Sequence, residues 1–295
     1  MNPVNGDAFR GLCDHAFWHN AAPRENPGFR HGDVVFCKID EVWRLFRALR
    51  RTRKRIVLVT GEGDKPVTPG LWRQKPPQVT AWFGTNMFAE SETAHPLPLG
   101  LGNANDPATL DWADIENAST QPPARSLVLY ANFGTRSNPT VREPLLDWVS
   151  RSEQDWITRQ PHAAGGGKAV YLQQLFTHRY VLCPPGNGED THRMWEALYC
   201  GAIPIVRRSP AIRDFRDLPI FFVEDFLTLT PQLLAESTVR GSGEKLDLAW
   251  WRSRLHTSRE SARQKGLLSP TEWLQGWLQE VRRICFYRGS HGLNG

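Results

Sequence analysis

Short apolar runs alternate with amphipathic stretches along most of this chain. Apolar runs bounded by turn residues predict strands over 33–37, 55–60, 79–83, 96–100, 126–132, 155–158, 180–183, 203–206 and 219–223. Helical spacing predicts helices over 41–51, 139–151, 168–178, 190–200, 246–265 and 270–286. Strands that alternate with helices in this way indicate an α/β fold with largely parallel sheets. Residues 1–32 show no period, and we expect irregular structure there.

The stretch from Tyr180 to Val206 contains a complete strand–loop–helix–strand unit. The apolar strand ends at Cys183, and the run PPGNG over 184–188 can continue neither a helix nor a sheet. We expect Asp190 to cap the next helix and Gly201 to adopt the left-handed conformation after its end. The pattern is typical of a βαβ unit in a parallel sheet.

The glycine-rich loop of this unit is a candidate phosphate site. A loop that feeds a helix N-terminus directs backbone N–H groups and the positive end of the helix dipole toward one point. At about 100° per residue, His192, Arg193 and Glu196 share one face of the helix. Arg193 would neutralise a diphosphate, and Glu196 would accept hydrogen bonds from ribose hydroxyls. The alternative is a weak surface salt bridge between Arg193 and Glu196.

The run PPGNGEDTHRMWEALYCGAIPIV resembles the nucleotide-binding signature of exostosin-like glycosyltransferases, which include bacterial relatives of the capsule and lipopolysaccharide type. Weaker similarity continues at Ile56–Gly61 with Asp64, at Asn86, at Pro96–Gly100, at Tyr130–Phe133 with Asn138 and Arg142, and at Asp217–Pro219. The resemblance implies a GT-B architecture, in which two Rossmann-like domains with parallel sheets face each other across a cleft. It also implies that the donor sugar nucleotide is held by Gly186, Asn187, Gly188, Asp190, Thr191, His192, Arg193, Glu196, Arg142 and Asn132.

Arg142 lies near the start of a predicted helix that Asn138 caps and Pro139 opens. If the second sheet is parallel, this position lies beside the cleft and the guanidinium can reach a phosphate. The alternative is that the arginine is a solvated surface residue. For the neighbouring Arg136 this alternative explains the position at least as well as phosphate binding does. The resemblance favours the phosphate for Arg142.

The catalytic base is expected at the carboxyl ends of the first strands, where ligands bind in open α/β sheets. Asp40, Glu62, Asp64 and Asn86 all follow predicted strands. An acceptor hydroxyl that attacks an anomeric carbon needs a carboxylate or a histidine to take its proton. Asp64 matches a TG-x-x-D pattern of the resemblance and is our first candidate, and Asp40 is the second. Alternatively, Asp64 closes a polar turn before Pro66.

The length of 295 residues predicts two domains of about 130 to 160 residues, because a single core rarely serves a longer chain. The aperiodic stretch 118–124 contains a proline pair and is the best candidate linker. We expect an acceptor-side domain over 1–120, a nucleotide-sugar domain over 121–268, and a C-terminal helix over 269–295 that crosses back to the first domain. The apolar stripe suited to that crossing is Trp273, Leu274, Trp277, Leu278 and Val281.

Charge and cysteine content narrow the class of protein. The 36 Lys plus Arg against 31 Asp plus Glu give a formal charge of +5, which modestly favours anionic partners such as nucleotides. This charge is too diffuse for a nucleic-acid-binding protein. The 5 cysteines lack CxxC spacing, and neither a leader nor an apolar run of about 18 residues is present. We therefore expect a cytoplasmic protein, drawn to the inner membrane as a peripheral protein if its acceptor is lipid-linked.

The sequence contains no Asp-x-Asp motif, and its nearest imitation is Glu62-Gly63-Asp64. A metal site of the GT-A kind would hold Mg²⁺ or Mn²⁺ on such a pair. We therefore expect no metal and no cofactor apart from the donor. The prediction is an inverting, metal-independent glycosyltransferase that moves a sugar from a nucleotide-sugar donor, with UDP favoured, to a glycan or glycolipid acceptor. The alternative is a non-catalytic nucleotide-sugar or glycan-binding module on the same fold.

Overall fold

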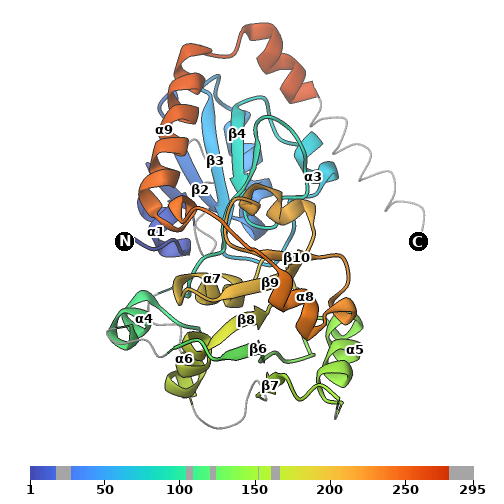
Figure 1. The fold of residues 1–295 in the computed structure, drawn as a ribbon. Coiled ribbons are helices and arrows are strands. Elements are labelled where there is room, and N and C mark those ends of the chain that lie inside the picture. The colour runs from blue at the N-terminus through green and yellow to red at the C-terminus, as the bar shows by residue number, and fades with distance from the viewer. Residues whose placement is uncertain (18–27, 104–108, 120–123, 152, 161–166, 279–295) are drawn as a thin grey trace, which may run out of the picture.

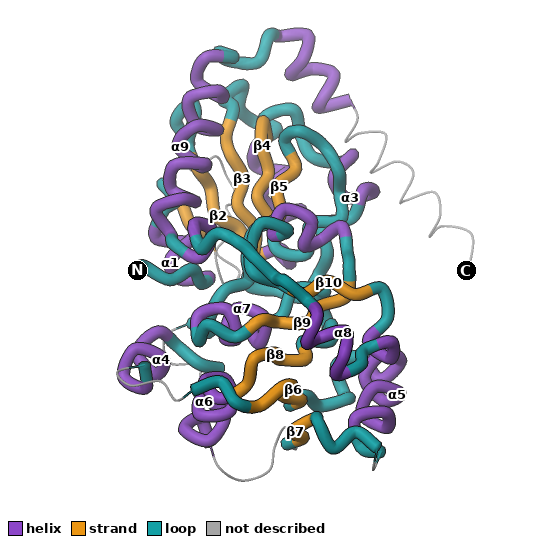
Figure 2. The backbone as a smooth tube through the Cα atoms, viewed as in Figure 1, coloured by secondary structure: helices purple, strands orange, loops and turns teal. Residues whose placement is uncertain are grey.

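The structure is a computed structural model that describes every residue except 18–27, 104–108, 120–123, 152, 161–166 and 279–295. Figures 1 and 2 show two sheets, one above the other, joined by a central layer of loops and short helices. The first sheet has the order β1-β2-β3-β4-β5 and consists of β1 (His15–Phe17), β2 (Val34–Lys38), β3 (Ile56–Gly61), β4 (Val79–Gly84) and β5 (Ala94–Pro96). The second has the order β10-β9-β8-β6-β7 and consists of β6 (Leu127–Ala131), β7 (Ile157–Arg159), β8 (His178–Leu182), β9 (Ile203–Arg207) and β10 (Phe221–Val223).

The neighbouring strands of both sheets are paired in parallel. All six residues of β3 are buried, as are the first four of β2. Strands that are covered on both faces read as continuous apolar runs, which is why the sequence located them to within a few residues. The expected α/β class and the two parallel sheets are confirmed.

Helices cover the faces of both sheets. They are α1 (Gly6–Gly11), α2 (Val42–Leu49), α3 (Pro69–Arg73), α4 (Trp112–Ala118), α5 (Pro139–Val149), α6 (Gly167–Thr177), α7 (His192–Tyr199), α8 (Pro231–Glu236) and α9 (Leu248–Gln264). Four 3-10 turns are η1 (Ile39–Glu41), η2 (Pro210–Phe215), η3 (Phe226–Thr228) and η4 (Glu244–Leu246). The α2 helix buries Val42, Leu45, Phe46 and Leu49, which is the apolar face that its sequence predicts.

Two segments differ from their sequence-based predictions. The expected irregular N-terminal region contains α1 and β1, and β1 pairs with β2. Three residues are too few to show a period, so this edge strand has no sequence signature. The strand predicted over 96–100 is β5 and ends at Pro96. The following residues form a loop, in which the Leu99 N–H donates to Asp190 of the second domain over 2.7 Å.

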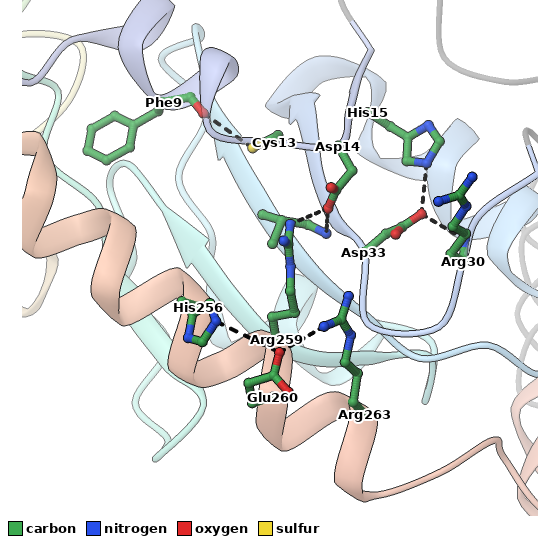
Figure 3. A network of polar contacts seen from close by, with 11 residues as sticks. Phe9, Cys13, Asp14, His15, Arg30, Asp33, His256, Arg259, Glu260 and Arg263 are labelled. Atoms are coloured by element: carbon green, nitrogen blue, oxygen red, sulfur yellow. Dashed lines mark hydrogen bonds and ion pairs between the residues drawn. The ribbon is translucent and has the colours of Figure 1, made fainter.

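The chain returns to the first domain in α9, upstream of residue 269, where we expected the crossing. This helix contacts β3 and β4 and runs along the first sheet (Figure 1). Figure 3 shows Arg259 of α9 beside Asp14, to which it donates a hydrogen bond. Asp14 also accepts the Val34 N–H at 2.8 Å, and His15 pairs with Asp33 at 2.8 Å close by. Arg259 therefore attaches α9 to the residue before β1, which is itself bonded to β2, while the helix packs on β3 and β4.

Of the predicted linker, residues 120–123 lie outside the described part of the chain, and α4 ends just before them at Ala118. The predicted C-terminal helix is present over 270–278, and Val281 lies outside the description. No helix among the described residues is long and apolar enough to span a membrane.

Stability at the domain junction is expected to fall in acid because of His95. The ring lies 4.5 Å from that of Phe83, and burial together with Arg254 and Arg213 lowers the pKa of His95 to about 4. Unfolded chains bind this proton near pH 6.5, so the contribution of His95 to stability is complete above pH 6.5 and is lost as the pH falls toward 4. Between pH 7 and 4.5 the parent should lose about 1–2 kcal/mol more unfolding free energy than His95→Phe. Urea unfolding at both pH values measures this, and equal losses would contradict it.

Candidate functional site

The strand order of the second sheet contains a topological switch point. From β6 the chain passes outward to β7 and then returns to the other side of β6 to form β8. In parallel sheets the crevice at such a reversal, beyond the carboxyl ends of the two strands, is where ligands bind. The loop after β8 is the glycine-rich run 184–188, and the loop after β6 begins at Asn132. The glycine-rich loop and Asn132, which the resemblance assigns to the donor, therefore meet at this point.

Arg142 holds the two loops together. It is only 7% exposed, and it donates to the carbonyls of Pro184 and Pro185 at 3.0 and 2.8 Å. It also donates to Gly134 O at 2.8 Å and to the Ser137 hydroxyl at 2.9 Å. We expected this guanidinium to contact a phosphate itself. Its donors point to protein acceptors instead, so Arg142 positions the loop.

Other bonds make the glycine-rich loop rigid. Gly186 N–H donates to Gly188 O at 2.9 Å, and Asn138 donates its side-chain N–H to Gly186 O at 3.2 Å. A Cβ on residue 186 would lie 3.0 Å from the Arg142 guanidinium, so glycine permits the close approach. Asn138 is the N-cap residue of α5, as predicted, but makes no side-chain cap bond there.

The N-terminus of α7 carries positive charge without a side-chain cap. Its N-cap residue is Thr191, where we expected Asp190, and the Thr191 side chain makes no cap bond. Arg193 Nε is buried and has no hydrogen-bond partner. After burial, the charge of Arg193 is the second cause that lowers the pKa of Arg142 to about 10, so the two guanidinium groups lie near each other. A helix terminus and two arginines thus concentrate positive charge here.

Glu196 is placed differently from our expectation. It is 4% exposed; one carboxylate oxygen accepts the Leu110 N–H at 3.1 Å and the other accepts the Tyr171 hydroxyl at 2.7 Å. A carboxylate bonded in this way is open neither to a ribose nor to a surface ion pair with Arg193. Its role is to tie α7 to α6 and to the segment before α4.

Asp190 and Asn86 join the two domains at the glycine-rich loop. Asp190 accepts the Leu99 N–H and, at 2.6 Å, the Trp195 indole N–H, and burial raises its pKa to about 7. Asn86 has a left-handed backbone, with φ of 51°. Its side-chain oxygen accepts the N–H groups of Glu189 and Asp190 at 3.0 and 3.2 Å. Any Cβ on residue 188 would collide with the Asn86 amide, so Gly188 is required for this contact.

The other residues that we expect to bind the donor nucleotide lie around the same loop. Asn187 donates to Asp64 of the first domain at 2.9 Å. Asn132 is 7% exposed and donates to the Tyr130 hydroxyl at 3.0 Å. His192 Nδ1 lies 2.8 Å from Gly100 O, which can only accept. His192 therefore carries its proton on Nδ1, and in the neutral ring Nε2 is an acceptor.

A cavity of about 670 Å³ opens at the carboxyl ends of the first sheet. His192 reaches it from α7 of the second domain, and the rest of its lining comes from the first domain. Asp40, Glu62 and Asp64 are its acidic lining residues. The structure therefore brings the three carboxylates that follow β2 and β3 to one place, as their position after the strands predicted.

These three carboxylates have different surroundings. Asp64 is exposed and accepts from Asn187, whereas Asp40 forms an ion pair with Lys65 at 2.8 Å. Glu62 has a side chain that is 9% exposed, accepts from Asn103 at 2.9 Å and forms an ion pair with Arg10 at 3.6 Å, and burial raises its pKa. Its backbone is left-handed, with φ of 59°, which is uncommon for a residue other than glycine. Strain of this kind gathers at functional sites, yet the sequence signals it only through the flanking glycines of Gly61-Glu62-Gly63.

Two Rossmann-like domains with parallel sheets thus face a common cleft, with a carboxylate-lined cavity on one side and a glycine-rich loop on the other. This is the two-domain arrangement that the sequence resemblance implied. Three contacts cross the cleft directly, from Asn86, Leu99 and Asp64 of the first domain to the loop before α7. Among the described residues, no three His, Cys, Asp or Glu side chains gather as metal ligands.

Comparison with known proteins adds little to this. No family model matches the sequence, and neither does any curated protein. One similar structure is α,α-trehalose 6-phosphate synthase from Burkholderia multivorans, with a TM-score of 0.42 and 9% identity over 88% of this chain and 73% of that one. An α1,3-fucosyltransferase with GDP-fucose has a TM-score of 0.38 and 13% identity over 80% and 79% of the two chains. The GtfA/B complex has a TM-score of 0.33 and 10% identity over 87% and 58%. Similarity this weak assigns no function, and the resemblance to exostosin-like enzymes stays a prediction.

Proposed function

We propose that this protein is a glycosyltransferase whose donor is a sugar linked to a nucleoside diphosphate. The observation that carries the proposal is the buried, unpartnered Nε of Arg193, next to Arg142 and behind the uncapped start of α7. A buried N–H without an acceptor is costly, and a second nearby cation raises the cost. A diphosphate supplies both the acceptor oxygens and the negative charge that this corner lacks.

The cavity on the opposite side of the cleft suits the acceptor. Its volume of about 670 Å³ is that of a small-molecule site, and its lining contains three carboxylates and the ammonium groups of Lys38 and Lys65. Sugar hydroxyls can donate hydrogen bonds to the carboxylates and accept them from the ammonium groups, so a glycan or glycolipid headgroup fits this mixed lining. The loop before α7 contacts the cavity through Asn187, which donates to Asp64, and His192 of α7 lines the cavity. This closeness supports a reaction between a donor held by the loop and an acceptor held in the cavity.

The proposed reaction is a single displacement with inversion. The acceptor oxygen forms a bond to the anomeric carbon while the bond from that carbon to the diphosphate oxygen breaks. The acceptor proton passes to a carboxylate of the cavity, and Arg193 with the α7 terminus receives the charge of the departing diphosphate. Glu62 is the best base, because burial raises the pKa of its carboxyl even though the Arg10 guanidinium lies 3.6 Å away. Asp64 is exposed, and Asp40 has a closer ion pair with Lys65 at 2.8 Å. Asp64 and Asp40 are the competing candidates.

Metal independence and UDP are the finer parts of the proposal. Arginine and a helix terminus are placed to meet the diphosphate charge without a cation, which supports the first. Preference for UDP, and an acceptor of the polysaccharide or lipopolysaccharide type, rest on the sequence resemblance alone.

A panel of UDP-, GDP- and CMP-sugars tests the proposal, with glycan acceptors present and absent. We expect slow release of nucleotide from one class of donor, accelerated by an acceptor and nearly unchanged in EDTA. Loss of activity in EDTA with recovery in Mn²⁺ would refute metal independence. Tight binding of a donor with no turnover under any condition would instead identify a non-catalytic binding module.

A further inference from the structure

Exposed apolar side chains are concentrated in one short segment near the C-terminus. Four of the nine exposed large hydrophobic residues in the described chain lie within residues 267–278: Leu267, Leu274, Trp277 and Leu278, which are 52%, 50%, 49% and 44% exposed. Single apolar residues are ordinary on a protein surface, whereas a cluster of large ones marks an interaction site. Figure 1 places this segment at the end of the first domain farthest from the second.

The helix over 270–278 is held to the first domain by one side only. Trp273 donates its indole N–H to Arg50 O at 2.8 Å, and a Cβ on Gly276 would lie 2.7 Å from Pro77. Leu274, Trp277 and Leu278 have the i, i+3, i+4 spacing of a single helix stripe, and each of them is exposed. The exposed stripe is therefore a fixed feature of the fold.

A basic loop lies against this segment. The run RRTRKR over 50–55 has five cationic residues in six positions. Leu268 N–H donates to Arg53 O at 2.8 Å, and Arg53 Nε donates to Leu268 O at 2.6 Å. Arg55 donates to Gly266 O at 3.0 Å and forms an ion pair with Glu272 at 3.0 Å. Exposed Lys265 lies close enough to Lys75 to lower the pKa of that ammonium, although burial is the larger cause.

We propose that this basic–apolar face, formed by Leu267, Leu274, Trp277 and Leu278 with Arg53, Lys54 and Lys265, binds the surface of an anionic phospholipid membrane. Leucine and tryptophan side chains enter the boundary between headgroups and acyl chains, and lysine and arginine remain at the phosphates. Arg50 is buried and Arg55 is paired with Glu272, but Arg53, Lys54 and Lys265 are not buried and lie beside the stripe. These three cations favour an anionic lipid surface over an apolar protein groove.

The face and the cavity lie at opposite ends of the first sheet. Arg55 directly precedes β3, whereas Glu62 directly follows it, and a strand of six residues spans about 20 Å. A lipid-linked acceptor would have to extend along the domain by about that distance to reach Glu62. Only this use of the face rests on the proposed function, because membrane binding can be measured without any sugar transfer.

Sedimentation with vesicles tests the proposal, using the full chain at several salt concentrations. The parent should sediment with vesicles of phosphatidylcholine plus phosphatidylglycerol and much less with phosphatidylcholine alone. The double variant Leu274→Ser/Trp277→Ser should lose about tenfold or more in vesicle partitioning. Lys54→Gln/Lys265→Gln should weaken binding to the anionic vesicles and reduce its sensitivity to salt. The matched control is Leu227→Ser/Leu233→Ser, which removes apolar residues exposed by 45% and 41% elsewhere and should bind like the parent.

Several results would overturn the inference. These are absence of the parent from sedimented anionic vesicles, equal loss in the control variant, or a parent dimer that Leu274→Ser/Trp277→Ser converts to monomer without affecting vesicle binding. The last would identify the face as a contact between two copies of the chain. Circular dichroism of each variant checks that the fold is retained, which we expect because the replaced side chains are exposed.

Discussion

Replacement of Glu62 by glutamine should lower the rate of sugar transfer by about 10²- to 10⁴-fold and leave donor affinity unchanged. The glutamine amide has the shape of the carboxylate and its oxygen can still accept from Asn103, but it cannot take a proton. Glu62 lies in the first domain, away from Arg193 and the glycine-rich loop that we assign to the nucleotide. The loss should therefore appear in kcat, with the nucleotide Kd measured by calorimetry as the control.

Asp64→Asn and Asp40→Asn are the matched controls for this prediction. Asp64 is exposed and bonded to Asn187, so its amide should cost about 1 kcal/mol of stability at most and little rate. A parental rate in Glu62→Gln, together with a large loss in Asp64→Asn, would return the base role to Asp64. The pH profile gives a second criterion. Because burial raises the pKa of Glu62, the acid limb of kcat/KM should lie above the ordinary value of 4.5 and should vanish in the glutamine variant.

Arg193→Ala is expected to weaken nucleoside diphosphate binding by about 1.5–3 kcal/mol, or roughly 10- to 150-fold in Kd. The buried Nε has no partner in the protein, so its hydrogen bond should form only with a ligand. Arg193→Lys should recover part of the affinity, since it restores the charge without the planar fork. Calorimetric titration with UDP and GDP measures both effects.

Melting temperatures measured without ligand are the control that distinguishes a ligand-binding role of Arg193 from a structural role. Arg193→Ala should melt at the parental temperature or above it, because the substitution removes a buried donor that lacks an acceptor. Arg142→Ala should melt earlier, because four acceptors would lose their partner. Exposed Arg136→Ala should match the parent in both measurements. A diphosphate affinity in Arg193→Ala equal to that of the parent would show that the donor does not bind at this corner.

The sequence was sufficient to locate the two sheets and the glycine-rich loop. Strands buried on both faces must be apolar along their whole length, and the run PPGNG can form only a turn. Both features can be recognised from residues that are adjacent in the sequence. The same local logic placed Asp40, Glu62 and Asp64 at one edge of the first sheet, because the carboxyl ends of parallel strands meet. The local sequence pattern does not show how deeply each carboxylate is buried, and the choice of catalytic base depends on that burial.

Only the tertiary structure decided which polar groups of the second domain are open to a ligand. On a helical projection Glu196 and Arg193 share a polar face. In the structure Glu196 accepts hydrogen bonds from Leu110 and Tyr171, whereas Arg193 Nε has no partner. Asn86 reaches the glycine-rich loop across about a hundred residues of sequence, and no spacing rule connects positions so far apart. A buried polar group must find its partner wherever packing brings one, so its role is determined by the meeting of the two domains and not by its neighbours in the chain.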